Sequence, residues 1–123
     1  MKRMHKSALL TEGGKPVNYC GVRCSLEVLG GKWKMLILSA LITAPRRYAD
    51  LRRALPDISE KMLIASLKEL EEHQLVDKHV EYSIPVKVSY ALSDYGQRVR
   101  PVLATLYEWG QAHIAQHSDV LFH

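Results

Sequence analysis

Apolar residues recur at helical spacing through the first half of the chain, and this pattern predicts a series of short helices. Leu63 and Leu67, for example, lie four residues apart on one face of the longest segment. Gly30, Pro45 and Pro56 mark the ends of the segments, because glycine favours helix termini and a residue before proline avoids helical backbone. The predicted helices span residues 20–29, 32–44, 48–55 and 59–74.

The start of the fourth helix has two candidate capping residues. Asp57 and Glu60 have the spacing of a capping box, and Ser59 is an equally good N-cap. The sequence leaves both open, so this boundary is defined only to within about two residues.

Beyond this helix the pattern changes to the alternation of apolar and polar residues that is typical of strands. Two strands are predicted, at residues 76–82 and 86–92, joined by a turn around residues 83–85. A final helix follows, capped by Ser93 or Asp94. Pro101 should kink this helix unless it lies in the first turn. Its apolar stripe contains Val99, Leu103, Leu106 and Ile114, with Trp109 close by.

This order of elements predicts a mainly helical α+β fold. Two short helices followed by a two-stranded ribbon form a winged helix-turn-helix, in which the second helix enters the major groove of DNA and the ribbon reaches a neighbouring groove or the backbone. A chain of 123 residues is the size of a single folding unit. We expect a flexible N-terminal arm at residues 1–18, the winged domain at 19–117 and a C-terminal tail at 118–123.

The positive charge is concentrated in one part of the chain. Residues 30–61 contain seven basic and three acidic side chains, which accounts for the whole formal charge of +4. A surface that binds phosphates needs such a concentration, because each neutralised phosphate releases counterions. The alternative is an ordinary solvated basic face.

The fourth predicted helix carries the chemistry suited to DNA. Ser59, Lys61 and the helix N-terminus can meet phosphates, while Ile64, Ala65 and Ser66 are small or apolar enough to approach base edges. Solvated lysines with no ligand remain an alternative for Lys61 and Lys68. The candidate DNA-binding residues are Arg46, Arg47, Ser59, Lys61, Met62, Ile64, Ala65, Ser66, Lys68 and Lys87.

Several short motifs occur together over about residues 20–112. They are Cys20, Gly30-Gly31-Lys32-Trp33, Pro45-Arg46-Arg47-Tyr48, Leu51-Arg52, Ile58-Ser59-Glu60-Lys61-Met62-Leu63, Leu67-Lys68-Glu69-Leu70, Pro85-Val86-Lys87-Val88 and Tyr90-Ala91-Leu92-Ser93. In this joint pattern the sequence resembles the HxlR-type bacterial regulators, relatives of the MarR group. The resemblance implies a homodimeric winged-helix protein, often a repressor, that binds a pseudo-palindromic operator in double-stranded DNA.

The resemblance also implies roles for particular segments. It places the groove-reading helix at residues 59–74, the wing tip at 82–87 and the dimer contacts on the first and last helices, which are therefore extra dimerisation helices. The dimer residues expected on the last helix are Val99, Leu103, Leu106, Trp109 and Ile114. This chain has Ile64-Ala65-Ser66 where relatives often carry longer polar side chains. Thymine-methyl contact or shape readout is therefore favoured over hydrogen-bonded readout.

Cys20 and Cys24 are candidate redox-sensing residues. Cys20 lies ten residues before Gly30-Gly31, where many members of the resembled family carry a cysteine that senses oxidants or electrophiles. A helix N-terminus and the nearby Arg23 could stabilise its thiolate. The alternative is an inert thiol. If both cysteines lie on one helix, their Cβ atoms are too far apart for an unstrained intramolecular disulfide, so a bond between subunits, a mixed disulfide or direct alkylation is favoured.

Other functions have weaker support in the sequence. His113 and His117 could chelate a metal, but no complete four-ligand pattern occurs, so no metal or cofactor is expected. No convincing catalytic pair is present, which argues against a small thiol-dependent enzyme. A winged-helix module that binds only protein remains the main alternative. Neither an export signal nor a run long enough to span a membrane is found, so we expect a cytoplasmic protein with reduced cysteines.

Overall fold

The computed structural model describes residue 14 and residues 18–117. They form two parts that are considered separately, divided between Lys32 and Trp33. Nearly all of the predicted N-terminal arm and the whole predicted tail lie outside the described residues. The elements are α1 (Tyr19–Leu29), α2 (Lys32–Leu41), β1 (Arg46–Arg47), α3 (Tyr48–Ala54), α4 (Glu60–Glu72), β2 (Val76–Glu81), β3 (Lys87–Leu92), η3 (Gly96–Val99) and α5 (Arg100–Gln116). Among these residues no helix is long and apolar enough to cross a membrane.

The first part of the chain contains α1, whose side chains from residue 20 to residue 27 are exposed. The helix ends at Gly30, whose amide donates to the Leu26 carbonyl at 2.8 Å. A Cβ at Gly30 would lie 2.0 Å from that same oxygen, so no other residue fits. Gly31 follows with a φ of +86°. The glycine pair therefore ends α1, as the sequence predicts.

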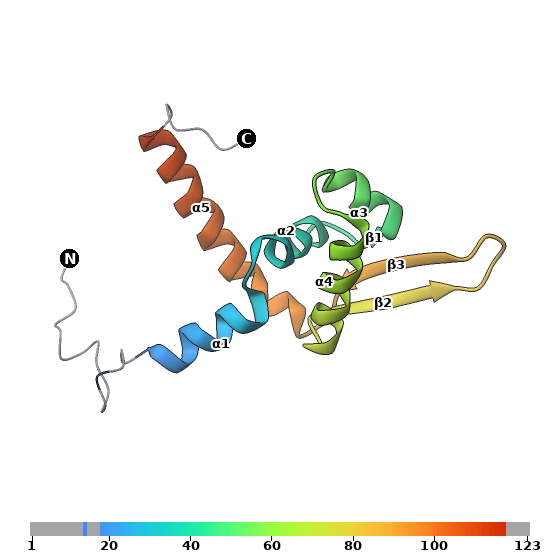
Figure 1. Ribbon diagram of the computed structural model, residues 1–123, viewed down its shortest axis with the longest axis horizontal. Coiled ribbons are helices and arrows are strands. Elements are labelled where there is room, and N and C mark those ends of the chain that lie inside the picture. The colour runs from blue at the N-terminus through green and yellow to red at the C-terminus, as the bar shows by residue number, and fades with distance from the viewer. Residues whose placement is uncertain (1–13, 15–17, 118–123) are drawn as a thin grey trace. The chain divides into compact units, whose positions relative to one another are not determined.

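The second part is built around a core of leucine and isoleucine side chains from α2, α3 and α4. Figure 1 shows these three helices together beside the sheet. Leu63, Leu67 and Leu70 share the buried face of α4, as their spacing predicts. The side chains in this core that are almost completely buried are Ile37, Leu38, Leu51, Leu63, Leu67 and Leu70.

Helix α2 ends at Leu41, three residues before the predicted end at Ala44. Side-chain donors replace the next helical amides at this terminus. The Arg46 guanidinium donates to the Ala40 carbonyl at 2.6 Å, and that of Arg100 donates to the Ile42 carbonyl at 2.7 Å. Two positive groups at the negative end of a helix are electrostatically favourable.

Both ends of α4 are closed by specific hydrogen bonds. Ser59 is the N-cap, since its hydroxyl accepts from the Met62 amide at 3.1 Å. Of the two candidates, Ser59 rather than Asp57 is therefore the cap, and such a cap contributes about 1 kcal/mol. At the other end Gln74 has a φ of +64°, and the amides of Gln74 and Leu75 donate to the carbonyls of Glu71 and Leu70. This is a Schellman motif, with glutamine in the position that glycine usually occupies.

The sheet has three antiparallel strands in the order β1-β3-β2. Strands β2 and β3 form the predicted hairpin, which projects away from the helices in Figure 1. Their register pairs Lys78 with Tyr90 and Glu81 with Lys87. The two-residue strand β1 was not predicted, and it pairs Arg46 with Tyr90. It is too short to produce a detectable alternation in the sequence.

Ser93 links the hairpin to the last helix. Its hydroxyl donates to the Gln74 carbonyl at 2.6 Å and accepts from the Gly96 amide at 2.8 Å. The chain then forms the short helix η3 and continues into α5. Pro101 lies in the first turn of α5, the position in which proline causes no kink. Leu103 is the only buried residue of α5.

Candidate nucleic-acid interface

Helices α3 and α4 are joined through their first residues. The Tyr48 hydroxyl donates to the Glu60 carboxylate at 3.3 Å, and Arg52 lies 3.6 Å from the other oxygen of that carboxylate. Glu60 also lies at the N-terminus of α4, where a negative charge is favourable. These surface contacts connect the two helices beside their shared buried core, as in a helix-turn-helix.

The exposed face of α4 is the one predicted from its periodicity. Lys61, Ala65 and Lys68 are exposed. Met62 and Ile64, at the margins of this face, are about half exposed. The face therefore combines two positive charges with small and apolar side chains, which suits phosphates at its edges and base methyl groups at its centre.

The prediction that Ser66 approaches base edges is wrong, because its side chain is only 4% exposed. It lies three residues after Leu63 and four before Leu70, so it belongs to the buried face of the helix. A side chain covered in this way cannot contact base edges. The error arose from grouping Ser66 with its sequence neighbours instead of with its helical face.

Charges near α4 are partly neutralised within the chain. Glu69 forms an ion pair with Lys34 of α2, and this hydrogen bond and charge lower the pKa of the Glu69 carboxyl below its usual value. Lys61 and Lys68, by contrast, form no ion pair with any described residue. Both remain available for phosphates.

Arg46 and Arg47 are adjacent in the sequence but differ in their surroundings. Arg46 is partly buried, and its guanidinium also lies 3.5 Å from the Thr43 hydroxyl in addition to binding the Ala40 carbonyl. Two of its donors thus hold the end of α2, so a contact between Arg46 and DNA stays a prediction that rests on its remaining donors. Arg47 is exposed and remains a candidate.

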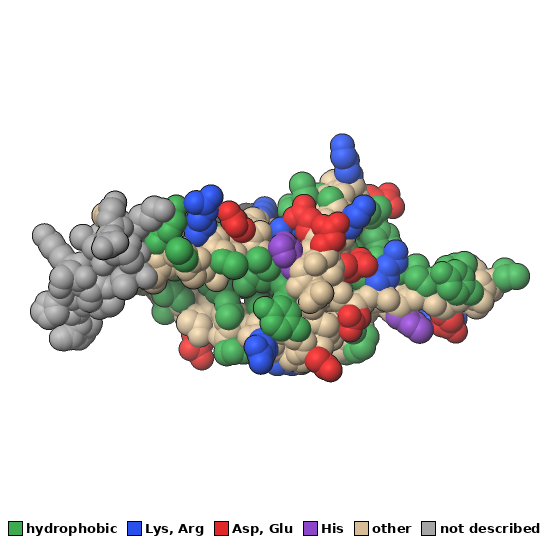
Figure 2. All heavy atoms as spheres, turned by 90° about the horizontal axis from the view of Figure 1, so that it is seen from below, with side chains coloured by type: hydrophobic (Ala, Val, Ile, Leu, Met, Phe, Trp, Pro, Cys, Tyr) green, Lys and Arg blue, Asp and Glu red, His purple; other side chains and the backbone are tan. Residues whose placement is uncertain are grey.

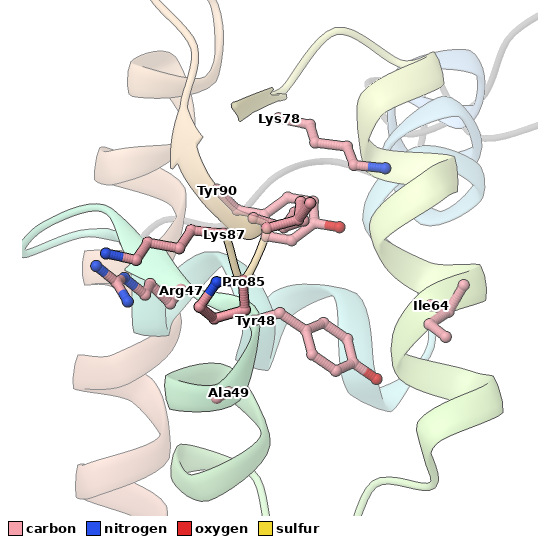
Figure 3. A pocket seen from close by; sticks show the side chains of 10 residues that line it. Arg47, Tyr48, Ala49, Ile64, Lys78, Pro85, Lys87 and Tyr90 are labelled. Atoms are coloured by element: carbon pink, nitrogen blue, oxygen red, sulfur yellow. The ribbon is translucent and has the colours of Figure 1, made fainter. Parts of the chain in front are cut away.

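A groove of about 530 Å³ lies between β1, α3, α4 and the hairpin. In Figure 3 Lys78 and Tyr90 extend toward α4, whereas Arg47 and Lys87 point together to the other side of the sheet. Burial, followed by the charge of Glu71 and of Tyr48, raises the pKa of Tyr90. The groove lining contains no carboxylate, and it consists of Arg47, Tyr48, Ala49, Ile64, Lys78, Pro85, Val86, Lys87, Val88 and Tyr90.

The outer end of the hairpin, residues 82–86, is uncharged and, apart from the partly buried Ser83, apolar and exposed. Tyr82 is 87% exposed, Ile84 is fully exposed and Val86 is more than half exposed. Figure 2 shows hydrophobic side chains covering this end of the hairpin. The family resemblance placed the wing tip at residues 82–87, but only Lys87 of this segment was predicted to bind DNA, and Lys78 was not predicted. The apolar residues Tyr82, Ile84 and Val86, in and beside the predicted turn, were the signal that could have drawn attention to this end.

The predicted redox residues lie on α1, and both cysteines are exposed and free. Cys20 is in the first turn of the helix, as expected. Arg23, however, donates to the Tyr19 hydroxyl at 3.0 Å and to Glu27 at 3.3 Å. These bonds, led by that to Tyr19, raise the pKa of Arg23. Tyr19 and Glu27 therefore compete with the Cys20 thiolate for the guanidinium of Arg23.

The residues predicted for the dimer interface divide into two groups. Val99 and Leu103 are buried in the protomer itself, so the prediction that they contact a partner is not supported by their position. Leu106, Trp109 and Ile114 are exposed on α5 and remain candidates. The rings of Trp109, His113 and His117 are stacked in sequence, and no cluster of three or more metal-ligating side chains occurs among the described residues.

Together, a helix-turn-helix with an exposed basic face on its second helix and an adjoining two-stranded wing define a winged-helix DNA-binding protein. Residues 28–118 match the family described as HxlR-like helix-turn-helix proteins. The chain belongs to this family and is a helix-turn-helix transcriptional regulator, as its sequence motifs predict.

Known proteins extend this comparison. The chain is 42% identical to the HTH-type transcriptional regulator YkvN of Bacillus subtilis over 91 residues, which covers 74% of this chain and 77% of YkvN. The structure of the redox regulator HypR in its reduced form is similar with a TM-score of 0.76, 32% identity and coverage of 81% of this chain and 99% of HypR. The diamide-treated YodB of B. subtilis gives a TM-score of 0.64, 33% identity and coverage of 75% and 91%.

Proposed function

We propose that this regulator is a dimeric, sequence-specific repressor that binds a pseudo-palindromic operator in double-stranded DNA. The single observation that carries the proposal is the exposed face of α4, on which Lys61 and Lys68 have no ion-pair partner among the described residues. In this binding mode Ala65 and Ile64 approach bases, while the lysines and Ser59 at the helix N-terminus meet phosphates.

An apolar surface on α5 supports the proposed dimer. Leu106 is 51% exposed and Trp109 is 66% exposed, and contiguous exposed apolar side chains often mark a protein–protein interface. A two-fold dimer would present two copies of α4 to successive major grooves, roughly 34 Å apart. The operator would then carry the same symmetry as the protein.

Modification of Cys20 is the proposed means of regulation. The thiol is exposed in the first turn of α1, and the similar proteins HypR and YodB are described as a redox regulator and as diamide-treated, respectively. Diamide takes up two hydrogen atoms as two thiols join in a disulfide. The second thiol is that of another protomer or of a small thiol compound, because the geometry within one helix is unfavourable. A small electrophile that alkylates Cys20 would act at the same place.

Selection of duplexes from a random pool tests the proposed function. We expect a symmetric sequence to be enriched, bound in a salt-dependent manner and released after diamide treatment. A protein that binds no duplex at any salt concentration would instead be an interaction module for other proteins. Enrichment without a diamide effect would support the DNA-binding function and contradict the thiol regulation.

A further inference from the structure

The outer end of the β2–β3 hairpin has an unusual surface for an element expected to meet a polyanion. None of residues 82–86 is charged, and Ile84 is fully exposed. Burial of an exposed isoleucine side chain against an apolar surface stabilises a complex. The exposed end is therefore suited to an occupant with an apolar surface.

Local hydrogen bonds hold this end in one shape. The Ser83 hydroxyl donates to the Pro85 carbonyl at 2.8 Å, and the Ser83 amide donates to the Glu81 carbonyl at 2.9 Å. Ile84 lies between the two residues that the first bond connects, so its backbone is restrained. This restraint reduces the conformational entropy that is lost when the end of the hairpin contacts a partner.

Positive side chains lie on both faces of the hairpin behind its apolar end. The strand register places Lys78 on the same face as Tyr90, and Arg47 on the same face as Ser89 and Lys87. Figure 3 shows Lys78 directed to one side of the sheet and the Arg47 and Lys87 side chains to the other. Glu81 lies opposite Lys87 in the register, but no ion pair joins Arg47, Lys78 or Lys87 to a described carboxylate.

An apolar end with cations on either side matches the minor groove of DNA. Each edge of that groove carries a line of phosphates, and its walls are formed largely by sugars. The groove is too narrow for a two-stranded ribbon but admits a protruding side chain. Isoleucine and proline are among the residues that act as wedges between base steps in proteins that bind there.

We propose that the end of the hairpin enters the minor groove beside the operator half-site and that Ile84 acts as an apolar wedge against a base step. Arg47 and Lys87 hold the phosphates of one strand, and Lys78 holds those of the other. The inference rests on the proposed DNA-binding function and adds a DNA bend. It also adds a preference for deformable pyrimidine–purine steps at positions that α4 does not touch.

Bending of a selected duplex tests this inference directly. The duplex carries a fluorescence donor and acceptor at its ends, and the step beside each half-site is either pyrimidine–purine or part of an A-tract. We expect the wild-type protein to bend the duplex and to favour the pyrimidine–purine version by about tenfold. Ile84→Ser should lose more than half of the bend and most of the preference.

Three variants accompany Ile84→Ser. Ile84→Leu keeps an apolar wedge and should retain the bend, and Tyr95→Ser removes a half-exposed apolar side chain from outside the hairpin and should also retain it. Lys78→Ala should lower the salt slope of binding by about 0.9. Circular dichroism of each variant serves as the control for correct folding.

The outcomes separate this inference from the proposed function. Specific binding with equal bends in wild type and Ile84→Ser would overturn the wedge and leave the repressor proposal standing. A changed molecular mass in Ile84→Ser, with an unchanged bend, would also overturn it and identify the hairpin end as a protein contact. Absence of any specific duplex would overturn both proposals together.

Discussion

The hydroxyl of Tyr48, the first residue of α3, donates a hydrogen bond of 3.3 Å to the carboxylate of Glu60, the first residue of α4. Because it connects two helix starts, we expect this bond to influence how α4 is presented. Tyr48→Phe should reduce the free energy of unfolding by only about 0.5 kcal/mol, since the bond is exposed.

DNA affinity should be more sensitive than stability to the loss of this bond. We expect Tyr48→Phe to weaken specific binding about fivefold, the equivalent of ~1 kcal/mol. Tyr95→Phe is the matched control, because the Tyr95 side chain is also exposed and lies outside α3 and α4. Equal affinities of the two variants in fluorescence anisotropy would show that the bond does not orient α4.

Lys61 and Lys87 should contribute to binding without reading sequence. Each alanine variant should weaken binding to all duplexes and lower the slope of log affinity against log salt by about 0.9. Ala65→Ser, in contrast, should change which bases are preferred. Arg98→Ala, on η3, serves as the control with an unchanged slope. If both lysine variants bind like wild type at every salt concentration, these two phosphate contacts do not exist.

Exposed side chains on α5 should hold the dimer together. We expect light scattering to give about twice the chain mass of 14.0 kDa at micromolar concentration. Trp109→Arg and Leu106→Glu should shift this mass toward the monomer, because each buries a charge in an apolar interface. Ile84→Ser should remain dimeric. A monomeric wild-type protein would contradict the arrangement.

Cys20 should carry most of the response to oxidant. Cys20→Ser should bind DNA with near wild-type affinity under reducing conditions but lose its response to diamide, whereas Cys24→Ser should keep most of it. Electrophoretic mobility shifts with and without diamide measure the difference. An equal response of wild type and Cys20→Ser would assign the effect to Cys24 or to a noncovalent effector.

The ion pair between Lys34 and Glu69 should make stability depend on pH. The pKa of Glu69 is lowered in the folded protein, so its contribution is present above the unfolded pKa and is lost as the pH falls through the folded value. Glu69→Gln should therefore be slightly less stable than wild type at neutral pH and equally stable in acid. Urea unfolding at several pH values measures this, and a constant difference across the range would exclude the pair as its cause.

The sequence predicted those features that depend on repetition or on a local signal. The buried leucines of α4, the glycine terminus of α1 and the two hairpin strands were all predicted, because each follows from periodicity or from backbone preference. The exposure of Lys61 and Lys68 followed from the same helical period.

What the sequence did not predict depends on contacts between distant segments. Arg46 was predicted to bind DNA from its charge alone, but in the fold its guanidinium donates to the carbonyl of Ala40. Strand β1 exists only because β3 pairs with it. Likewise, the sequence shows a single apolar stripe at the end of the chain. It does not reveal that Val99 and Leu103 are buried within the protomer whereas Leu106 is exposed on its surface.

The backbone of Gln74, which has a left-handed conformation, determines which side chains of β2 face inward. Because the Schellman motif ends α4 at one defined residue, β2 begins its alternation with Val76 turned inward. A start one residue earlier or later would exchange the two faces of the strand. Lys78 and Val80 would then change sides together, and the cations would no longer flank the hairpin. A single backbone dihedral angle, eight residues before the exposed end begins, thus decides which surface the wing offers to DNA.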